Sequence, residues 1–315
     1  MNENGVEQQN VVKEPDLGVN LCGVHLANPV MTASGTFGSG MEYSDFVDLN
    51  RLGAVVTKGV SLVPWEGNPS PRVAETYGGM LNAIGLENPG IDVVIKRDLP
   101  FLSQFTTKVI VNVCGHTQDE YVAVAERLSC EEEVDMLEIN VSCPNVQKGG
   151  MAMGTDLKTL SGLTSKIKKV AKKPIIIKLT PNVTSIADMA KAAEDGGADA
   201  VSLINTITGM KIDVERQTFV LANKTGGLSG PAIHPVAVRM VYEVRQAVSI
   251  PIIGMGGIQN ADDAVELMLA GASAVAVGMS NFHDPDVTMK IVDGIHAYAV
   301  RHHLHSISEI VGAVH

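Results

Sequence analysis

The sequence predicts a (β/α)8 TIM barrel, in which eight parallel strands alternate with helices. Eight short runs of β-branched or apolar residues carry this prediction, and helical patterns separate most of them. The runs begin at Pro29, Ala54, Lys108, Asp135, Pro174, Asp199, Pro251 and Ser273. A second observation is that a polar residue or a glycine appears near the end of every run. Eight strands is the number that closes such a barrel.

Helical patterns and their capping residues fill the spaces between the runs. Helices are expected at 117–130, 157–172, 184–196, 234–248, 260–270 and 285–303. We expect Thr184 and Asn260 to be N-caps, and Gly196 and Gly271 to be left-handed residues at helix ends.

Two longer stretches do not fit a minimal barrel. Residues 59–90 follow the second predicted strand, and residues 208–235 follow the sixth. Long insertions after strands are where such proteins commonly build substrate sites. Neither stretch has the features of an independent domain.

The composition predicts a globular protein of one catalytic domain. Hydrophobic residues make up 45% of the 315 residues and charged residues 19%, which is enough to form a large core. The net charge of −11 excludes a broad basic surface for nucleic acid. No apolar run reaches the ~18 residues that span a bilayer. We expect a cytoplasmic protein with a flexible tail at 1–16 and a barrel at 17–315.

The cysteines do not form a redox or metal site of their own. Cys22, Cys114, Cys130 and Cys143 contain no Cys-x-x-Cys pair and are too sparse for a disulfide framework. Their spacing also fails for structural zinc or an iron–sulfur cluster. We therefore expect no metal in this chain, and any one-electron centre must lie on another chain.

The polar ends of the predicted strands indicate the position of the site. They are Ser34, Lys58, Asn112, Asn140, Lys178, Asn205, Gly256 and Gly278. In a barrel these ends meet at the face that carries the active site. For one Asn or Ser, a turn explains the residue equally well. A lysine directly after an apolar strand needs an anionic or electron-rich partner, which favours a functional role for Lys58 and Lys178.

Two further motifs indicate chemistry at this face. GMGG at 254–257 and VGMS at 277–280 end the last two strands, where such barrels usually bind phosphate, although a tight turn also explains GMGG. Cys143 follows the fourth strand at the barrel mouth, where lysines favour the thiolate. Elsewhere a free cysteine is more often a buried apolar residue than a functional one, and we interpret the other three, which lack such surroundings, as structural.

From about Val19 to the last helix, the chain resembles the class 1 dihydroorotate dehydrogenases. The motifs are ASGTFG at 33–38, TKGVSL at 57–62, GNPSPR at 67–72, NAIGLENPG at 82–90, INVSCPNV at 139–146, IIIKL at 175–179, INT at 204–206, GGLSGPAI at 226–233 and GMGGI at 254–258. A cysteine rather than a serine at 143, and the lack of a membrane helix, argue against the quinone-using class 2. NAIGLENPG and KGGMAMGTD favour the NAD-linked class 1B.

The resemblance implies a site for FMN and a pyrimidine. The implied FMN contacts are Ser34, Lys58, Gly59, Asn112, Asn140, Lys178, Ile204, Gly230, Gly256, Gly257, Gly278 and Met279. The implied pyrimidine contacts are Lys58, Asn82, Ala83, Ile84, Gly85, Leu86, Asn140, Asn145, Asn205 and Thr206. Cys143 would be the base that removes a proton from C5 of dihydroorotate while a hydride leaves C6 for N5 of FMN. Lys58 would meet the orotate carboxylate or reduced flavin, and Lys178 the N1–C2 side of the flavin.

The resemblance also implies an electron-transfer partner. That subunit would carry FAD and a 2Fe–2S cluster and reduce NAD+, in a heterotetramer built on a homodimer of this chain. Met279 departs from the family, which often has Thr there, and FMN would bind more weakly if that hydroxyl holds the phosphate. Trp65 is also unexpected, and we interpret it as a cover of the barrel mouth.

Two alternatives remain open. A chain like dihydropyrimidine dehydrogenase shares the barrel, FMN and the SCP loop, but would act on uracil or thymine, which lack a carboxylate. A non-catalytic barrel that binds a phosphorylated ligand would be colourless, whereas a yellow protein that releases FMN would exclude it.

Overall fold

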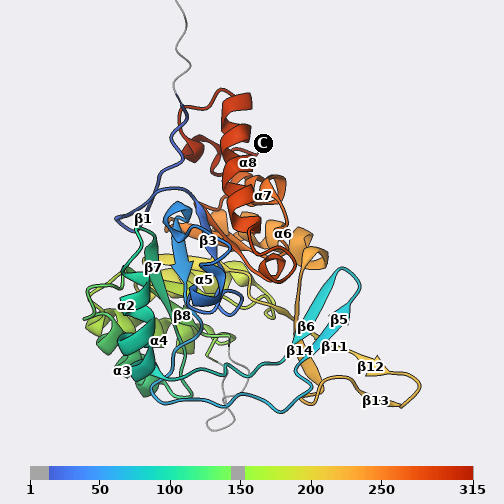
Figure 1. Ribbon diagram of the computed structural model, residues 1–315. Coiled ribbons are helices and arrows are strands. Elements are labelled where there is room, and N and C mark those ends of the chain that lie inside the picture. Colours follow the sequence, from blue (N-terminus) through green and yellow to red (C-terminus); the bar gives the residue numbers. More distant parts are fainter. Residues whose placement is uncertain (1–13, 143–152, 315) are drawn as a thin grey trace, which may run out of the picture.

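The computed structural model describes residues 14–142 and 153–314, which contain the predicted parallel barrel (Figure 1). It closes in the order β10-β15-β16-β3-β4-β7-β8-β9, and all neighbouring strands are parallel. The barrel strands are β3 (Val30–Thr32), β4 (Ala54–Val56), β7 (Lys108–Val113), β8 (Met136–Asn140), β9 (Ile175–Lys178), β10 (Ala200–Leu203), β15 (Ile252–Met255) and β16 (Ala274–Val277). Each lies within one of the eight predicted runs, so the predicted fold class is confirmed.

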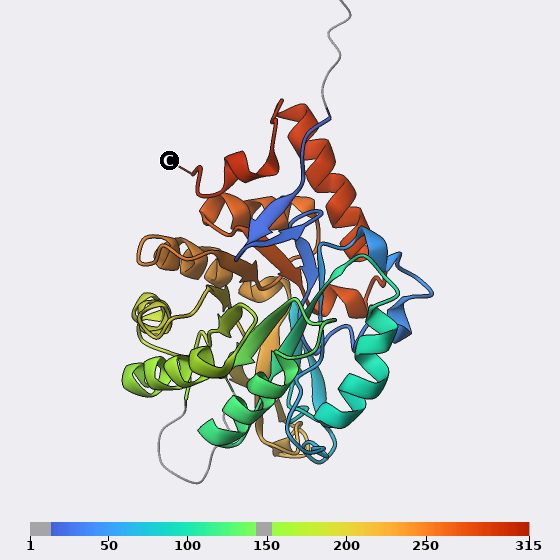
Figure 2. The ribbon, with the colours of Figure 1, turned by 90° about the vertical axis from the view of Figure 1, so that its left-hand side faces the viewer.

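Helices surround the barrel strands (Figure 2). The six predicted helices are present as α3 (Gln118–Leu128), α4 (Leu157–Val170), α5 (Ile186–Asp195), α6 (His234–Arg245), α7 (Ala261–Ala270) and α8 (Val287–Arg301). The sequence did not predict α1 (Ile91–Val93), α2 (Leu99–Leu102) and the π-helical turn η3 (Val94–Asp98) that joins them. Short 3-10 turns are η1 (Met41–Tyr43), η2 (Leu49–Arg51), η4 (Pro231–Ile233), η5 (Met279–Phe282) and η6 (Ile307–Ile310). None of these described helices is long and apolar enough to cross a membrane.

Two of the four predicted capping residues are confirmed, both at α7. The Asn260 side chain accepts a hydrogen bond from the Asp263 N–H in a capping box. Gly271 ends the same helix with a φ of +129°. These two residues satisfy backbone groups that would otherwise lack partners at the helix ends.

The two predicted caps of α5 are wrong by one residue each. Its N-cap is Ser185 rather than Thr184, because the Ser185 side chain is the one that accepts from the helix N–H of residue 188. Gly196 keeps a right-handed conformation because its N–H still bonds to the helix at Ala192 O. The left-handed residue is Gly197, with a φ of +95°.

Two stretches far apart in the sequence form a second sheet beside the barrel (Figure 1). Its four antiparallel strands, in spatial order, are β11 (Ile207–Met210), β14 (Thr225–Ser229), β6 (Gly79–Asn82) and β5 (Val73–Thr76). A two-stranded arm, β12 (Ile212–Asp213) and β13 (Thr218–Phe219), extends from it. Because β6 pairs with β14, the segments between β4 and β7 and between β10 and β15 are held together.

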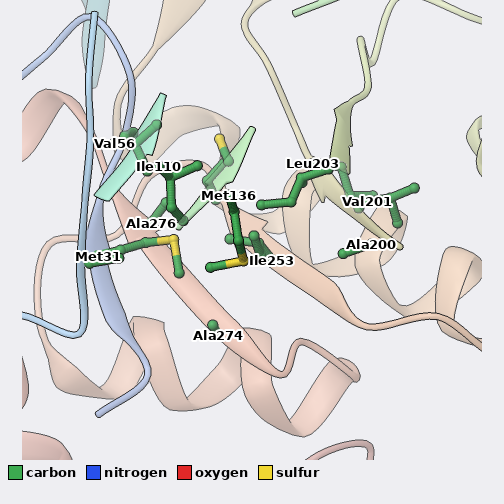
Figure 3. Close-up of a cluster of buried hydrophobic side chains, with 14 of the residues drawn as sticks. Met31, Val56, Ile110, Met136, Ala200, Val201, Leu203, Ile253, Ala274 and Ala276 are labelled. Atoms are coloured by element: carbon green, nitrogen blue, oxygen red, sulfur yellow. The ribbon is translucent and has the colours of Figure 1, made fainter. Parts of the chain in front are cut away.

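The barrel interior is layered, with an apolar layer beneath polar side chains. Val56, Ile110 and Met136 belong to the buried apolar cluster drawn in Figure 3. Alternate residues of a strand point to the same side, so Ile110 lies one layer below Asn112, and Met136 one layer below Glu138. The apolar layer supports the polar one, which faces the carboxyl ends of the strands.

The hairpin of β1 (Val19–Leu21) and β2 (Val24–Leu26) precedes the first barrel strand. In its turn, the Cys22 thiol donates a hydrogen bond to Asp199 O, just before β10 begins. A tail was predicted at residues 1–16. Its residues 1–13 lie outside the described residues. Asp16 itself forms a β-bridge with Ser306.

The surroundings of Cys22 predict an unreactive thiol. Burial, and secondarily the charge of Asp199, raise the pKa of Cys22 to about 12. At pH 8 about one Cys22 in ten thousand is then the reactive thiolate. Iodoacetamide at pH 8 should modify the exposed Cys130 well before Cys22 in the folded chain, as peptide mass spectrometry can measure. Equal labelling of the two in the folded protein would contradict this assignment.

Candidate functional site

A cavity of about 640 Å³ lies at the carboxyl ends of the barrel strands. The loops that follow the strands and the second sheet both contribute to its wall. It is lined by these predicted site residues: Ser34, Lys58, Gly59, Asn82, Ala83, Ile84, Gly85, Leu86, Asn140, Lys178, Ile204, Asn205, Thr206, Gly230, Gly256, Gly257, Gly278 and Met279. The fold therefore brings into one cavity residues that are spread over most of the sequence.

Three predicted site residues are not in this lining. Asn112 is completely buried and lies next to Gly59, where an added Cβ would be 3.1 Å from its Oδ1. Cys143 and Asn145 lie outside the described residues, so their roles stay predictions.

A cluster of polar side chains lies inside the barrel beneath the cavity, on four neighbouring strands. Glu138 on β8 accepts hydrogen bonds from Asn112 Nδ2 at 2.6 Å and from Ser202 Oγ at 2.8 Å. Its Oε2 is 3.5 Å from Lys178 Nζ. Glu138 is 2% exposed and Lys178 4% exposed. A buried pair of opposite charges persists when hydrogen bonds satisfy the remaining donors and acceptors, as they do around this carboxylate.

The sequence analysis missed Glu138, although a signal was present. Glu138 is a charged residue within an apolar strand, which is the argument that selected the two lysines. It also lies two residues before Asn140, and therefore on the same side of β8. The anionic partner expected for Lys178 is thus supplied, at least in part, by the barrel itself.

The loop of residues 82–90 forms one wall of the cavity, and Asn88 holds its shape. Asn88 Oδ1 accepts hydrogen bonds from the N–H and Oγ of Ser61 and from the N–H of Gly90, at 3.2, 3.0 and 2.9 Å. Its Nδ2 donates to Leu86 O at 2.9 Å. Gly85 and Leu86 take positive φ angles of 78° and 55°, so this part of the loop is tightly turned.

Charged and aromatic contacts tie the same loop to its surroundings. Arg72 donates a hydrogen bond to Glu87 Oε2 at 2.6 Å. This bond, with the charges of Arg72 and Lys58, lowers the pKa of Glu87 below its usual value. The carboxylate is therefore charged at neutral pH. Trp65 pairs with Asn88 through the backbone and stacks on His116 with ring centroids 3.9 Å apart, and it does not line the cavity.

The turn after β15 requires its two glycines because α6 packs directly against it. Gly256 and Gly257 have φ angles of +132° and +71°. A Cβ on Gly256 would lie 2.8 Å from the Cβ of Ala237, and one on Gly257 would lie 2.7 Å from the Cβ of His234. These distances are too short for real side chains. The turn thus exposes backbone to the cavity where the sequence predicted a phosphate site.

Two observations show that the cavity fits a bound cofactor such as FMN. The buried Asn112 Oδ1 has no hydrogen-bond partner among the described residues, and a buried acceptor of this kind needs one. The backbone at Gly278 has open space beside it, since an added Cβ would meet only Ala33 and Thr36 at 3.6 and 3.8 Å. A ligand in the cavity can therefore approach the backbone closely at 278.

The fold and the cavity define the class: a closed parallel barrel with a large cavity at the carboxyl ends of its strands, the face on which barrel enzymes carry their active sites. Comparison with known proteins identifies the family. A family model described as dihydroorotate dehydrogenase matches residues 16–298. The chain belongs to the dihydroorotate dehydrogenase family.

Curated relatives match nearly the whole chain. The protein of Lachnoclostridium phytofermentans is 62% identical over 94% of this chain and 98% of its own length. That of Alkaliphilus metalliredigens is 57% identical over 95% of this chain and 99% of its own. That of Geotalea uraniireducens is 53% identical over 96% and 99%. All three are named dihydroorotate dehydrogenase B (NAD(+)), catalytic subunit.

The buried ion pair of Lys178 and Glu138 predicts a large loss of stability when one of the two charges is removed. Lys178→Met leaves Glu138 buried without its cation, and the free energy of unfolding should fall by about 3–5 kcal/mol. Adding Glu138→Gln to Lys178→Met removes the uncompensated charge and should restore part of this loss. Urea unfolding followed by circular dichroism measures both variants. If Lys178→Met is as stable as the unchanged chain, the two groups do not interact as an ion pair.

Asn88 is expected to stabilise the 82–90 loop. Asn88→Ala leaves the buried N–H groups of Ser61 and Gly90 without their acceptor and should cost about 1–3 kcal/mol in urea unfolding. Ser61→Ala is the matched control, because it removes the hydroxyl but leaves both N–H groups paired with Asn88. The unfolding free energy of Ser61→Ala should fall clearly less than that of Asn88→Ala. Equal losses in the two variants would mean that the N–H groups of Ser61 and Gly90 find other acceptors.

Proposed function

We propose that this chain is the FMN-carrying catalytic subunit of an NAD+-linked dihydroorotate dehydrogenase, which oxidises dihydroorotate to orotate in pyrimidine biosynthesis. The observation that carries the proposal is the cavity that gathers most of the residues implied for FMN and for the pyrimidine. The names of relatives at 53–62% identity support the substrate and the NAD+ linkage. They favour dihydroorotate over uracil or thymine.

The residues named below would hold FMN in the cavity. FMN supplies a hydride acceptor when it is bound. The turn at Gly256 and Gly257, together with Gly278 and Met279, would donate backbone N–H groups to the phosphate. Asn112 and Lys178, above the apolar layer, would meet the polar edge of the flavin ring. Glu138 would hold Lys178 in place while the lysine favours negative charge on that edge.

The asparagine side chains of the cavity would recognise the pyrimidine. Asn82, Asn140 and Asn205 line the cavity, and each amide offers both a donor and an acceptor. This is what a ring of alternating N–H and C=O groups requires. Lys58 would pair with the substrate carboxylate, and Thr206 and the 82–90 loop would enclose the ring.

Cys143 would act as the base that takes the proton from C5 of dihydroorotate. Its own position is not described, but Ser142 on one side of the segment and Gly154 and Thr155 on the other line the cavity. A thiolate near lysine side chains is a base suited to neutral pH. Asn145, in the same segment, would be a further pyrimidine contact.

The electrons would leave this chain through a partner subunit. The relatives are named as catalytic subunits of an NAD(+) enzyme, which supports a second subunit in the assembly. That subunit would carry FAD and a 2Fe–2S cluster, in a heterotetramer with a homodimer of this chain at its centre. No cysteine set for such a cluster is evident in the sequence of this chain.

Anaerobic mixing with dihydroorotate tests the proposed function. The purified chain should be yellow. Dihydroorotate should bleach the flavin absorbance at about 450 nm without any partner subunit. Uracil and thymine serve as controls that lack the carboxylate and should not react. A colourless chain, or one that reacts with pyrimidines but not with dihydroorotate, would overturn the assignment.

Cys143→Ser tests the base. A hydroxyl is a much weaker base than a thiolate, so flavin bleaching at neutral pH should slow by roughly 10²–10⁴-fold and recover in part as the pH rises. Cys130→Ser is the control at an exposed cysteine and should bleach at the normal rate. Normal bleaching by Cys143→Ser would show that another group takes the proton.

A further inference from the structure

His234 is a buried titratable residue with no role in the function proposed above. It is the first residue of α6, is 8% exposed and does not line the cavity. It lies directly behind the turn at Gly256 and Gly257, because a Cβ on Gly257 would come within 2.7 Å of its own Cβ. Its position is therefore behind the backbone that faces the predicted phosphate.

Both ring nitrogens of His234 face hydrogen-bond acceptors. Nδ1 is 2.8 Å from Gly256 O, a carbonyl that can only accept. Nε2 is 3.1 Å from Glu266 Oε2 and 4.0 Å from Asp263 Oδ1, both on α7. Because a carbonyl oxygen can only accept, Nδ1 donates the proton of its bond to Gly256 O. The carboxylates of α7 lie on the other side of the ring.

The bond to Gly256 O acts on one peptide unit. The carbonyl of Gly256 and the N–H of Gly257 belong to the same planar amide, so a hydrogen bond donated to the oxygen polarises the N–H. That makes the Gly257 N–H a stronger donor to an anion in the cavity. The contact also fixes the orientation of the amide, since rotation of the peptide would break it.

We propose that His234 is a positioning residue for the phosphate group of the cofactor: it holds and polarises the Gly256–Gly257 peptide so that the Gly257 N–H binds the phosphate. This inference rests on the proposed function, because it takes FMN as the cofactor. It assigns His234 an effect on the phosphate end of FMN alone. The flavin ring and the substrate are not involved.

Comparison of FMN with riboflavin tests the inference, since riboflavin lacks the phosphate. Flavin is removed from the full-length chain, and the dissociation constants of both ligands are measured by quenching of flavin fluorescence. His234→Phe keeps a ring of similar size but removes the hydrogen bond to Gly256 O, and should weaken FMN binding by about 10-fold, or about 1.4 kcal/mol. Riboflavin binding should not change.

His234→Gln is the matched variant that retains a hydrogen-bond donor of similar reach. It should keep most of the preference for FMN over riboflavin that the unchanged chain shows. The inference is overturned if His234→Phe keeps the full preference, or if it loses FMN and riboflavin binding to the same extent, as a general loss of structure would cause. An unchanged chain that binds neither flavin would instead overturn the proposed function, and this inference with it.

Discussion

All eight strands of the barrel run in the same direction, and this constraint decides where the chemistry of the chain can lie. Closure of a parallel barrel places every carboxyl end on one face and fills the interior with side chains. Polar residues that follow strands at distant points of the sequence, such as Lys58, Asn140 and Asn205, then meet in one cavity. A change in the direction of any strand would move its terminal residues to the opposite face.

The interior of the barrel imposes a second constraint on this face. Apolar side chains such as Ile110 and Met136 offer no polar partner to a charge that lies above them. Lys178 can therefore extend into the barrel only because Glu138 accompanies it, with Asn112 and Ser202 bonded to the carboxylate. The cluster combines stability with function, since it sets the charge beneath the proposed flavin site.

The cavity also depends on elements outside the barrel. The sheet in which β6 pairs with β14 joins two insertions and forms the outer wall, and the Asn88 hydrogen bonds hold the loop that continues from β6. Next to the residue that follows β14, α6 packs so closely on the turn after β15 that only glycine fits at 256 and 257. The same packing places His234 behind that turn. The proposed pyrimidine and phosphate contacts are thus shaped by different parts of the chain.

The sequence alone determined the eight strands, the six long helices and the face on which the site lies, because these follow from local patterns of apolar and polar residues. It also selected Lys58 and Lys178, since a charge after an apolar strand is visible without a structure. It placed the caps of α5 one residue away from their positions, because local signals do not define where a helix ends. Only the tertiary structure revealed the partner of Lys178, the pairing of β6 with β14 and the two acceptors around His234. Those contacts join residues that are distant in sequence, and the distances and directions that make them hydrogen bonds exist only after the barrel has closed.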